Sequence, residues 1–367
     1  MLLAPAQARA EPSKSPTADP LLGLARTIAE LAAEKGHPLQ RDPALDRAAL
    51  AHAERLRTDP EGATLESVYE AIQNEGLADA QVLPFSILAA PREGAEALRR
   101  FAEVEARPRG LSHVGLASRP EGAEVRVVAL FSRRPLVLQP LTRTARPGTL
   151  TVRGQARGPV EALWVGPCPP DAPCRKGVNR LSVRRRGTVF RLELPLKRPG
   201  RYVLELLVTQ DRGPEVGALW TMAVGVPPGP IHTDTVSNTP DTSAGLRSLI
   251  EGARATAELS PLAPSEPLAR AAQAHAEAIC AARVAAHVLA GKGPEDRAKA
   301  AGHEGPVSEN VAIAGRVAKA HANFLLSPSH RANVLDPLAA ELGLGIAVRP
   351  ESPGLARAFC VVELYGR

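Results

Sequence analysis

The sequence is poor in aromatic residues and contains no long apolar run. Phe, Trp and Tyr make up only 3% of its 367 residues, too few to supply stacking platforms for nucleic-acid bases. The net charge is +6, but the basic residues are spread along the chain and cluster only at Arg184, Arg185 and Arg186. No run approaches the roughly 20 apolar residues that cross a bilayer. These absences argue against nucleic-acid binding and against a transmembrane segment.

Cysteine is also scarce, and its four positions form two candidate pairs. Cys168 and Cys174 flank a proline-rich loop that a disulfide would close. A zinc site is not expected there, because no second close Cys/His pair accompanies them. Cys280 and Cys360 would join a helix to the terminal strand across a loop of roughly 80 residues, and two buried thiols are the alternative. An even set of cysteines suits an oxidising compartment.

The first residues favour export. Ala8-Arg9-Ala10 fits the small-x-small pattern of a signal cleavage site, and a polar segment follows it. The sequence contains neither a charged n-region nor most of an apolar core, so a disordered leader is the alternative. We therefore expect residues 1–19 to be a leader, and the protein to be secreted, periplasmic or part of the cell envelope.

Two proline-rich breaks divide the rest of the chain. Between them, short alternating runs such as 189–194 and 202–208 are separated by turn signals. This pattern predicts a small antiparallel β-sandwich, immunoglobulin-like in type. We expect an α+β protein made of domains at 20–138, 139–226 and 244–367, with a linker at 227–243.

The two flanking parts resemble each other. Residues 48–56 parallel residues 271–279 at an offset of 223, and 114–116 parallel 342–344 at an offset of 228. A register that drifts by a few residues is typical of duplication with small insertions, although alanine-rich helices also match by chance. The matching His52 and His275 lie on apolar helix faces, which favours packing roles. We therefore predict that the N-terminal part is a degenerate copy of the C-terminal part.

Three later segments carry specific motifs. Residues 285–287 read Ala-Ala-His after a long amphipathic helix, 308–312 read Ser-Glu-Asn-Val-Ala, and 327–335 read Ser-Pro-Ser-His-Arg-Ala-Asn-Val-Leu. A Gly-x-Gly strand follows at 343–345. In this order, the segments resemble the bacterial branch of the CAP superfamily, the cysteine-rich secretory proteins, over about the last 120 residues. The resemblance implies an α-β-α sandwich around a central antiparallel sheet, with which the helix and strand patterns are compatible.

The resemblance also implies a set of site residues. His287 matches the first family histidine, Glu309 the glutamate of the Glu-Asn motif, and His330 the second histidine. Two imidazoles and a carboxylate suit zinc, the candidate cofactor, and would leave one coordination position open.

The match departs from the family at its second acid. The stretch 288–293 contains Lys292 and no carboxylate, and Glu295 and Asp296 lie farther along. Because a lysine near the site disfavours a cation, hydrogen bonding without a metal is the alternative to zinc binding.

Two classes of function remain open. Ser308, Ser327 and Ser329 lie near Glu309 or His330 in sequence, but Ser-Pro is a common helix-capping pair. Neither Gly-x-Ser-x-Gly nor His-Glu-x-x-His occurs, so no catalytic residue is assigned. The expected function is that of a non-catalytic binding protein with a lipid, glycan or peptide ligand in the cleft. A cleft-centred hydrolase, with or without a metal, is the alternative.

Overall fold

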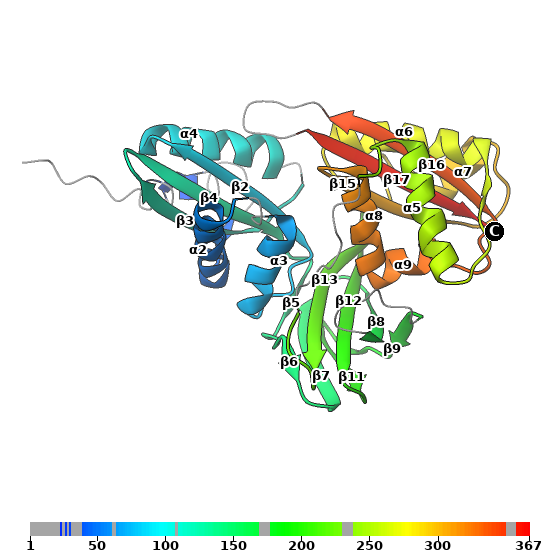
Figure 1. The fold of residues 1–367 in the computed structure, drawn as a ribbon, viewed down its shortest axis with the longest axis horizontal. Helices are drawn as coiled ribbons and strands as arrows, with labels where there is room; N and C mark the ends of the chain where they lie inside the picture. Colours follow the sequence, from blue (N-terminus) through cyan, green and yellow to red (C-terminus); the bar gives the residue numbers. More distant parts are fainter. Residues whose placement is uncertain are drawn as a thin grey trace, which may run out of the picture.

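The computed structural model describes residues 39–60, 64–106, 109–168, 177–229, 238–349 and 357–367, with a few residues between 23 and 30. These residues fold into an N-terminal domain, a β-sandwich and a C-terminal domain, which meet at the centre of the molecule (Figure 1). The described part of the chain contains no helix long and apolar enough to cross a membrane. The predicted leader and most of the predicted linker lie outside the described residues.

The N-terminal domain is a mixed sheet with helices on both faces. Its strand order is β1 (Gln40–Arg41), β3 (His113–Glu121), β4 (Glu124–Arg133) and β2 (Gln81–Ala89). Its helices are α2 (Pro43–Thr58), α3 (Leu65–Asn74) and α4 (Pro91–Phe101), which continues into the π-helical turn η1 (Ala102–Ala106). Asp42 caps α2, because its side chain accepts hydrogen bonds from the Ala44 and Leu45 amides.

The β-sandwich packs two sheets around a shared apolar core that includes Phe190, Tyr202 and Trp220. One sheet contains β10 (Arg184–Arg186), β11 (Val189–Leu196), β7 (Gly148–Ala156) and β5 (Leu136–Leu138). The other contains β6 (Thr144–Ala145), β13 (Gly213–Val224), β12 (Gly200–Gln210), β8 (Val160–Cys168) and β9 (Asn179–Leu181). The sandwich thus begins before residue 139, and β6 pairs with β13 in parallel, which the alternating pattern did not predict. Its immunoglobulin-like type stays a prediction.

The C-terminal domain is again a mixed sheet between helices. Its strand order is β14 (Ala263–Pro264), β16 (Glu341–Arg349), β17 (Ala358–Gly366) and β15 (Val307–Ala314). Its helices are α5 (Ser243–Thr256), α6 (Glu266–Ala282), α7 (Pro294–Ala300), α8 (Val317–Leu326) and α9 (Pro328–Val334). Strand β17 is buried along its whole length because helices cover both faces of the sheet. The α+β fold class expected from the sequence is therefore correct.

The two flanking sheets have the same strand order and the same register. In both, a two-residue strand pairs in parallel with the next-to-last strand, at Gln40 with His113 and at Ala263 with Glu341. These pairs differ by the offsets 223 and 228 that relate the two sequences. Gly115 and Gly343 also correspond, and they lie directly against the backbone of α2 at Leu45 and of α6 at Leu268, respectively. The shared topology agrees with duplication, and common origin stays a prediction.

The disulfide between Cys280 and Cys360 joins α6 to β17, with 5.6 Å between the two Cα atoms. This is the pairing expected from the sequence. Cys168 ends β8, whereas its predicted partner Cys174 lies outside the described residues.

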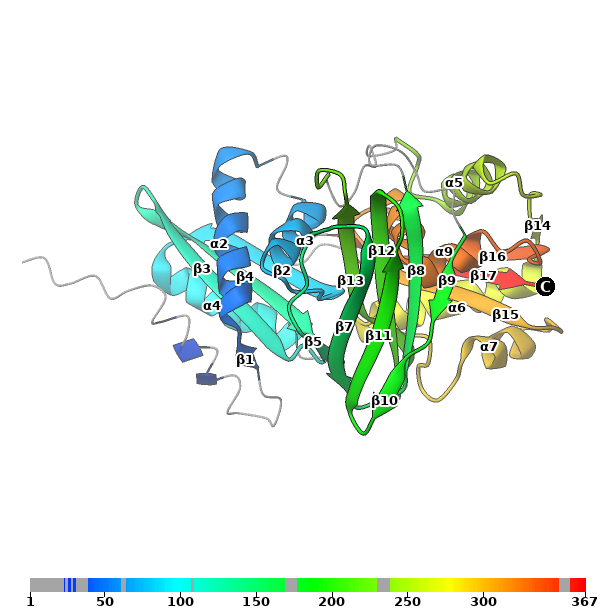
Figure 2. The ribbon, with the colours of Figure 1, turned by 90° about the horizontal axis from the view of Figure 1, so that it is seen from below.

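The domains contact one another through buried charges. Glu105 in η1 is completely buried and accepts hydrogen bonds from Arg109 of its own domain and from Arg283 and Arg349 of the C-terminal domain. On the sandwich side, strand β12 lies against helix α9 (Figure 2). The two flanking domains and the sandwich therefore enclose a common space.

Candidate functional site

The three residues predicted from the motifs come from three different elements of the C-terminal domain. His287 lies in the loop after α6, Glu309 in strand β15 and His330 in helix α9. Arg283 ends α6 in a left-handed conformation, with φ of 56°, and turns the chain toward His287. Pro328 begins α9, and the Ser327 carbonyl oxygen accepts the Arg331 amide one turn later. The fold thus brings together side chains that are 43 residues apart in sequence, from His287 to His330.

Glu309 binds two partners at once. Its Oε1 lies 2.9 Å from His287 Nδ1, and its Oε2 accepts a hydrogen bond of 2.6 Å from Arg297 Nη2. Arg297 comes from α7 and also donates to the His287 carbonyl oxygen at 3.0 Å. The Glu309 side chain is almost completely buried, so the guanidinium balances its charge in a region with little water. The Glu309 carboxylate therefore holds the His287 ring through Nδ1, and Nε2 takes no part in this contact.

His330 is held by a chain of polar groups that begins in the sandwich. Its Nδ1 lies 2.7 Å from Ser327 Oγ, which hydrogen-bonds Oε1 of Glu205 on β12. Oε2 of Glu205 accepts the Ser329 amide at 2.6 Å. Burial raises the pKa of Glu205, while burial and the neighbouring His287 lower the pKa of His330 to about 3. His330 is therefore neutral near neutral pH.

Behind the two histidines, the Asn residues of the motifs link the strands. Asn310 Nδ2 donates to Glu363 Oε2 at 2.9 Å and to the His330 carbonyl oxygen at 3.2 Å. Asn333 Nδ2 donates to Asn310 Oδ1 at 2.9 Å. Tyr365 donates its hydroxyl to the same Glu363 oxygen at 2.7 Å. This network pairs the two Asn side chains with each other, with Glu363 Oε2 and with the backbone, and it fixes α9 against β15, which positions His330.

The N-terminal domain has apolar residues where this network lies. When the strand pairing is followed through both sheets, the position of Glu309 corresponds to Pro84, and that of Asn310 to Phe85. Phe85 packs against Phe101 with ring centroids 4.9 Å apart. The described N-terminal sheet therefore has no acidic or amide side chain at the positions of Glu309 and Asn310.

The helix histidine His275 has the packing role expected for it. It is buried, and its Nε2 lies 2.8 Å from the Ala286 carbonyl oxygen. Burial lowers the pKa of its imidazole.

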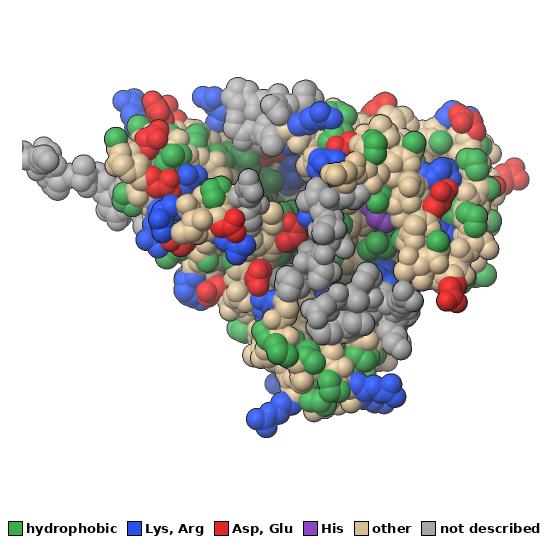
Figure 3. Space-filling view, viewed as in Figure 1, with side chains coloured by type: hydrophobic (Ala, Val, Ile, Leu, Met, Phe, Trp, Pro, Cys, Tyr) green, Lys and Arg blue, Asp and Glu red, His purple; other side chains and the backbone are tan. Residues whose placement is uncertain are grey.

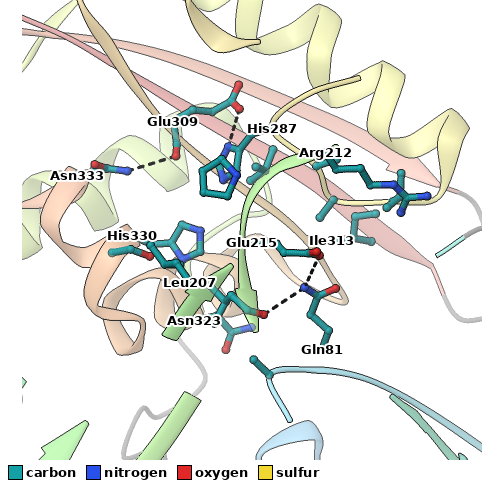
Figure 4. A pocket seen from close by; sticks show the side chains of 18 of the residues that line it. Gln81, Leu207, Arg212, Glu215, His287, Glu309, Ile313, Asn323, His330 and Asn333 are labelled. Atoms are coloured by element: carbon teal, nitrogen blue, oxygen red, sulfur yellow. Dashed lines mark hydrogen bonds and ion pairs between the residues drawn. The ribbon is translucent and has the colours of Figure 1, made fainter. Parts of the chain in front are cut away.

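A cavity of about 830 Å³ opens beside the two histidines. Its walls come from all three domains: Tyr69, Gln81 and Arg109 from the N-terminal domain, Leu207, Arg212 and Glu215 from the sandwich, and His287, Glu309, Asn323 and His330 from the C-terminal domain. Histidine is visible in the hollow beside the C-terminal domain (Figure 3). Close up, His287 and His330 lie next to each other, facing Leu207 and the Gln81–Glu215 pair (Figure 4). Their ring centroids are 6.4 Å apart.

The arrangement does not fit the predicted three-ligand zinc site. Both carboxylate oxygens of Glu309 have partners, and one partner is the cationic Arg297. A guanidinium beside the carboxylate disfavours a second cation. Among the described residues, no three or more His, Cys, Asp or Glu side chains are grouped so that they could hold a metal ion. Zinc binding itself stays a prediction.

The geometry also bears on nucleophilic catalysis. Ser327 is within hydrogen-bond distance of His330, but Ser327 is buried, and its other partners are Glu205 and, at 3.3 Å, Ser329 Oγ. In a serine hydrolase, the acid orients the histidine and the hydroxyl faces the substrate. Here the acid, Glu205, is hydrogen-bonded to the serine and not to the histidine. Ser327 therefore links Glu205 to the His330 ring and does not face the cavity as a nucleophile.

Sequence reasoning missed two residues that matter here. The sequence does not distinguish Arg297 from the other arginines, and the predicted neighbour of the site, Lys292, is not among the residues that line the cavity. Glu205 had a signal, since it is the one charged residue in the apolar run 202–208. A buried charge in a strand requires a partner. Glu295 lines the cavity, whereas Asp296 accepts the Gly293 amide and caps α7.

Comparisons with known proteins agree with these motifs. Residues 247–365 match the model of the CAP family, described as the cysteine-rich secretory protein family. No curated protein matches the chain.

Several solved structures are similar to this one at low identity. They are an outer surface protein from Borrelia burgdorferi (20% identity, 36% of this chain and 96% of that chain, TM-score 0.31), an extracellular SCP-domain protein from Bacillus anthracis (14%, 64% and 67%, 0.29) and a cysteine-rich secretory protein from Staphylococcus aureus (12%, 59% and 82%, 0.27). These scores are too low to carry an argument, and the family match carries the conclusion. Residues 247–365 of this chain form a CAP domain.

Proposed function

We propose that this protein is an exported, non-catalytic binding protein whose organic ligand occupies the cavity between its three domains. The observation that carries the proposal is the cavity itself, about 830 Å³ in volume and bordered by His287 and His330. This volume lies within the range of small-molecule sites, and a boundary between domains is a common place for them. The disulfide between Cys280 and Cys360 supports export, because such bonds persist in oxidising compartments.

The lining favours a ligand with both apolar and polar parts. Leu65, Leu83, Leu111, Val216 and Ile313 provide apolar wall, and the polar groups converge at the histidines and at Arg109 and Arg212. A few polar groups in an apolar cavity orient a ligand and give specificity. Lipids, glycans and peptides each offer this combination.

A hydrolase is the second candidate, and one observation favours it. The contact between His287 Nδ1 and Glu309 is the arrangement in which a carboxylate orients an imidazole as a general base. Arg297 weakens this reading, because it stabilises the carboxylate that would have to balance a protonated imidazole. Binding is therefore the better supported function.

The proposal can be tested on the full chain by blocking the cavity. Leu207→Trp places an indole in the cavity wall, and Thr209→Trp adds the same group at an exposed position on the same strand. The probes are a lysophospholipid, a chitin tetrasaccharide and a mixed-sequence hexapeptide, one for each ligand class. We expect titration calorimetry to show one probe binding to wild type and Thr209→Trp, with affinity at least tenfold lower in Leu207→Trp. Equal affinity in Leu207→Trp, or no binding of any probe to wild type, would contradict the proposal.

A further inference from the structure

Glu205 is a carboxylate inside an apolar sheet. It has no exposed surface, and its cross-strand neighbours on β12 are Leu219 and Leu163. Burying an ionisable group without partners is costly, so the groups that contact it are informative. These groups are Ser327 and Ser329, at the start of α9 in the CAP domain. A residue of the sandwich is therefore held by the CAP cleft.

In the ionised form of Glu205, both carboxylate oxygens can only accept hydrogen bonds, and the hydrogen atoms of this contact follow from that. The Ser329 amide has one hydrogen, and it donates that hydrogen to Glu205 Oε2. The Ser327 hydroxyl also has one hydrogen and lies between Glu205 Oε1 and His330 Nδ1. If it donates to the carboxylate, its oxygen can only accept from the ring. The hydrogen of the neutral imidazole is then on Nδ1.

We propose that Glu205 is a positioning residue of the CAP cleft, which acts through Ser327 to keep the His330 proton on Nδ1 and to present Nε2 to the cavity as a hydrogen-bond acceptor. Among the described residues, Nε2 of His330 makes no hydrogen bond, and His330 lines the cavity. The packing of the sandwich against the CAP domain thus decides that His330 presents a hydrogen-bond acceptor to the cavity.

The His287 ring is oriented in the same way. Glu309 accepts from Arg297 and faces His287 Nδ1, so the His287 proton also lies on Nδ1. The two imidazole rings, with centroids 6.4 Å apart, therefore both have Nδ1 on a protein partner and leave Nε2 to the cavity. On the basis of the proposed function, the ligand places a hydrogen-bond donor, such as a hydroxyl group, against His330 Nε2, where an acceptor-only carboxylate is disfavoured.

The tautomer can be measured without any ligand. Histidine labelled with nitrogen-15 distinguishes the protonated ring nitrogen from the one with a lone pair, and His330→Gln identifies the His330 signals. We expect the ligand-free full chain to show the proton on Nδ1 of His330. A proton on Nε2 in wild type would overturn the proposal. Because no ligand is used, this outcome is independent of whether the cavity binds one.

Glu205→Gln is the decisive variant. The Ser329 amide still requires an acceptor, so the Gln carbonyl oxygen faces Ser329 and its NH2 group faces Ser327. The Ser327 oxygen then accepts from that NH2 group and turns its hydrogen to Nδ1. We expect the His330 proton to move to Nε2 in this variant and to stay on Nδ1 in Glu193→Gln, an exposed change in the same sandwich.

Two controls separate positioning from a structural role. A Glu205→Gln variant that unfolds at a lower temperature but keeps the wild-type tautomer would make Glu205 a structural residue only and refute the proposal. In the Ser327→Ala background the relay is absent, so we expect Glu205→Gln to leave the His330 tautomer unchanged. A tautomer change in that background would show that Ser327 is not the link, which also contradicts the proposal.

Discussion

At the scale of single residues, the cleft shows how environment changes a common side chain. His275, His287 and His330 all belong to the CAP domain, yet His275 is bonded to a backbone oxygen, His287 to a carboxylate and His330 to a hydroxyl. Only the hydroxyl partner of His330 is linked to another domain, through Glu205 of the sandwich. The sequence marks all three as histidines near a helix and does not distinguish these roles, because the partners come from distant segments.

The low pKa of His330 predicts a pH dependence of stability. The unfolded chain binds this proton near the ordinary value of 6.5, whereas the folded chain binds it only near 3. Stability from this group is therefore lost as the pH falls below 6.5. Between about pH 7.5 and pH 5, we expect wild type to lose up to about 2 kcal/mol more unfolding free energy than His330→Asn. Urea denaturation at both pH values measures this. Equal losses would show that His330 titrates normally.

At the scale of elements, the close contact between α6 and β16 determines how the core of the CAP domain packs. A Cβ atom built at Gly343 would overlap the backbone of Leu268 and Ala269 in α6. Gly115 has the same relation to Leu45 in α2 of the N-terminal domain. The Gly-x-Gly motif was predicted as a strand from the sequence. The reason for glycine at this motif, which is that α6 lies directly on β16, is visible only in the tertiary structure.

This contact predicts a large effect of one methyl group. Gly343→Ala should destabilise the protein by roughly 1–3 kcal/mol or more, because backbone atoms must move apart. Gly252→Ala is the matched control, since it lies in helix α5 with open space around its Cβ position. Alanine should stabilise that helix by up to about 1 kcal/mol. Thermal unfolding of both variants tests the difference. A Gly343→Ala protein as stable as wild type would mean that α6 and β16 are farther apart.

At the scale of the whole molecule, buried ion pairs hold the domains around the cavity. Glu105 has three arginine partners, two of which belong to the CAP domain. Lys319 of α8 also donates to Glu66 of α3 at 2.6 Å. The cavity has its shape only while these contacts hold the two flanking domains against each other.

Removing the charge of Glu105 should therefore separate the domains. Glu105→Gln leaves three arginines without their counter-charge, and the cost of breaking such a buried pair is roughly 3–5 kcal/mol. We expect calorimetry to show the N-terminal and CAP domains unfolding at more widely separated temperatures than in wild type. Glu96→Gln is the control, because its pair with Arg92 is exposed and contributes about 1 kcal/mol or less. An unchanged profile in Glu105→Gln would show that the domains are held by other contacts.

The sequence by itself determined the local features of this protein. The motifs around His287, Glu309 and His330 were found from the order of residues alone, as were the CAP domain and the α+β class, because period and capping signals act over a few residues. Only the tertiary structure decided what these side chains do. Arg297 and Glu205 reach the histidines through contacts that no local pattern encodes. The cavity is likewise made by three domains, each of which contributes one wall.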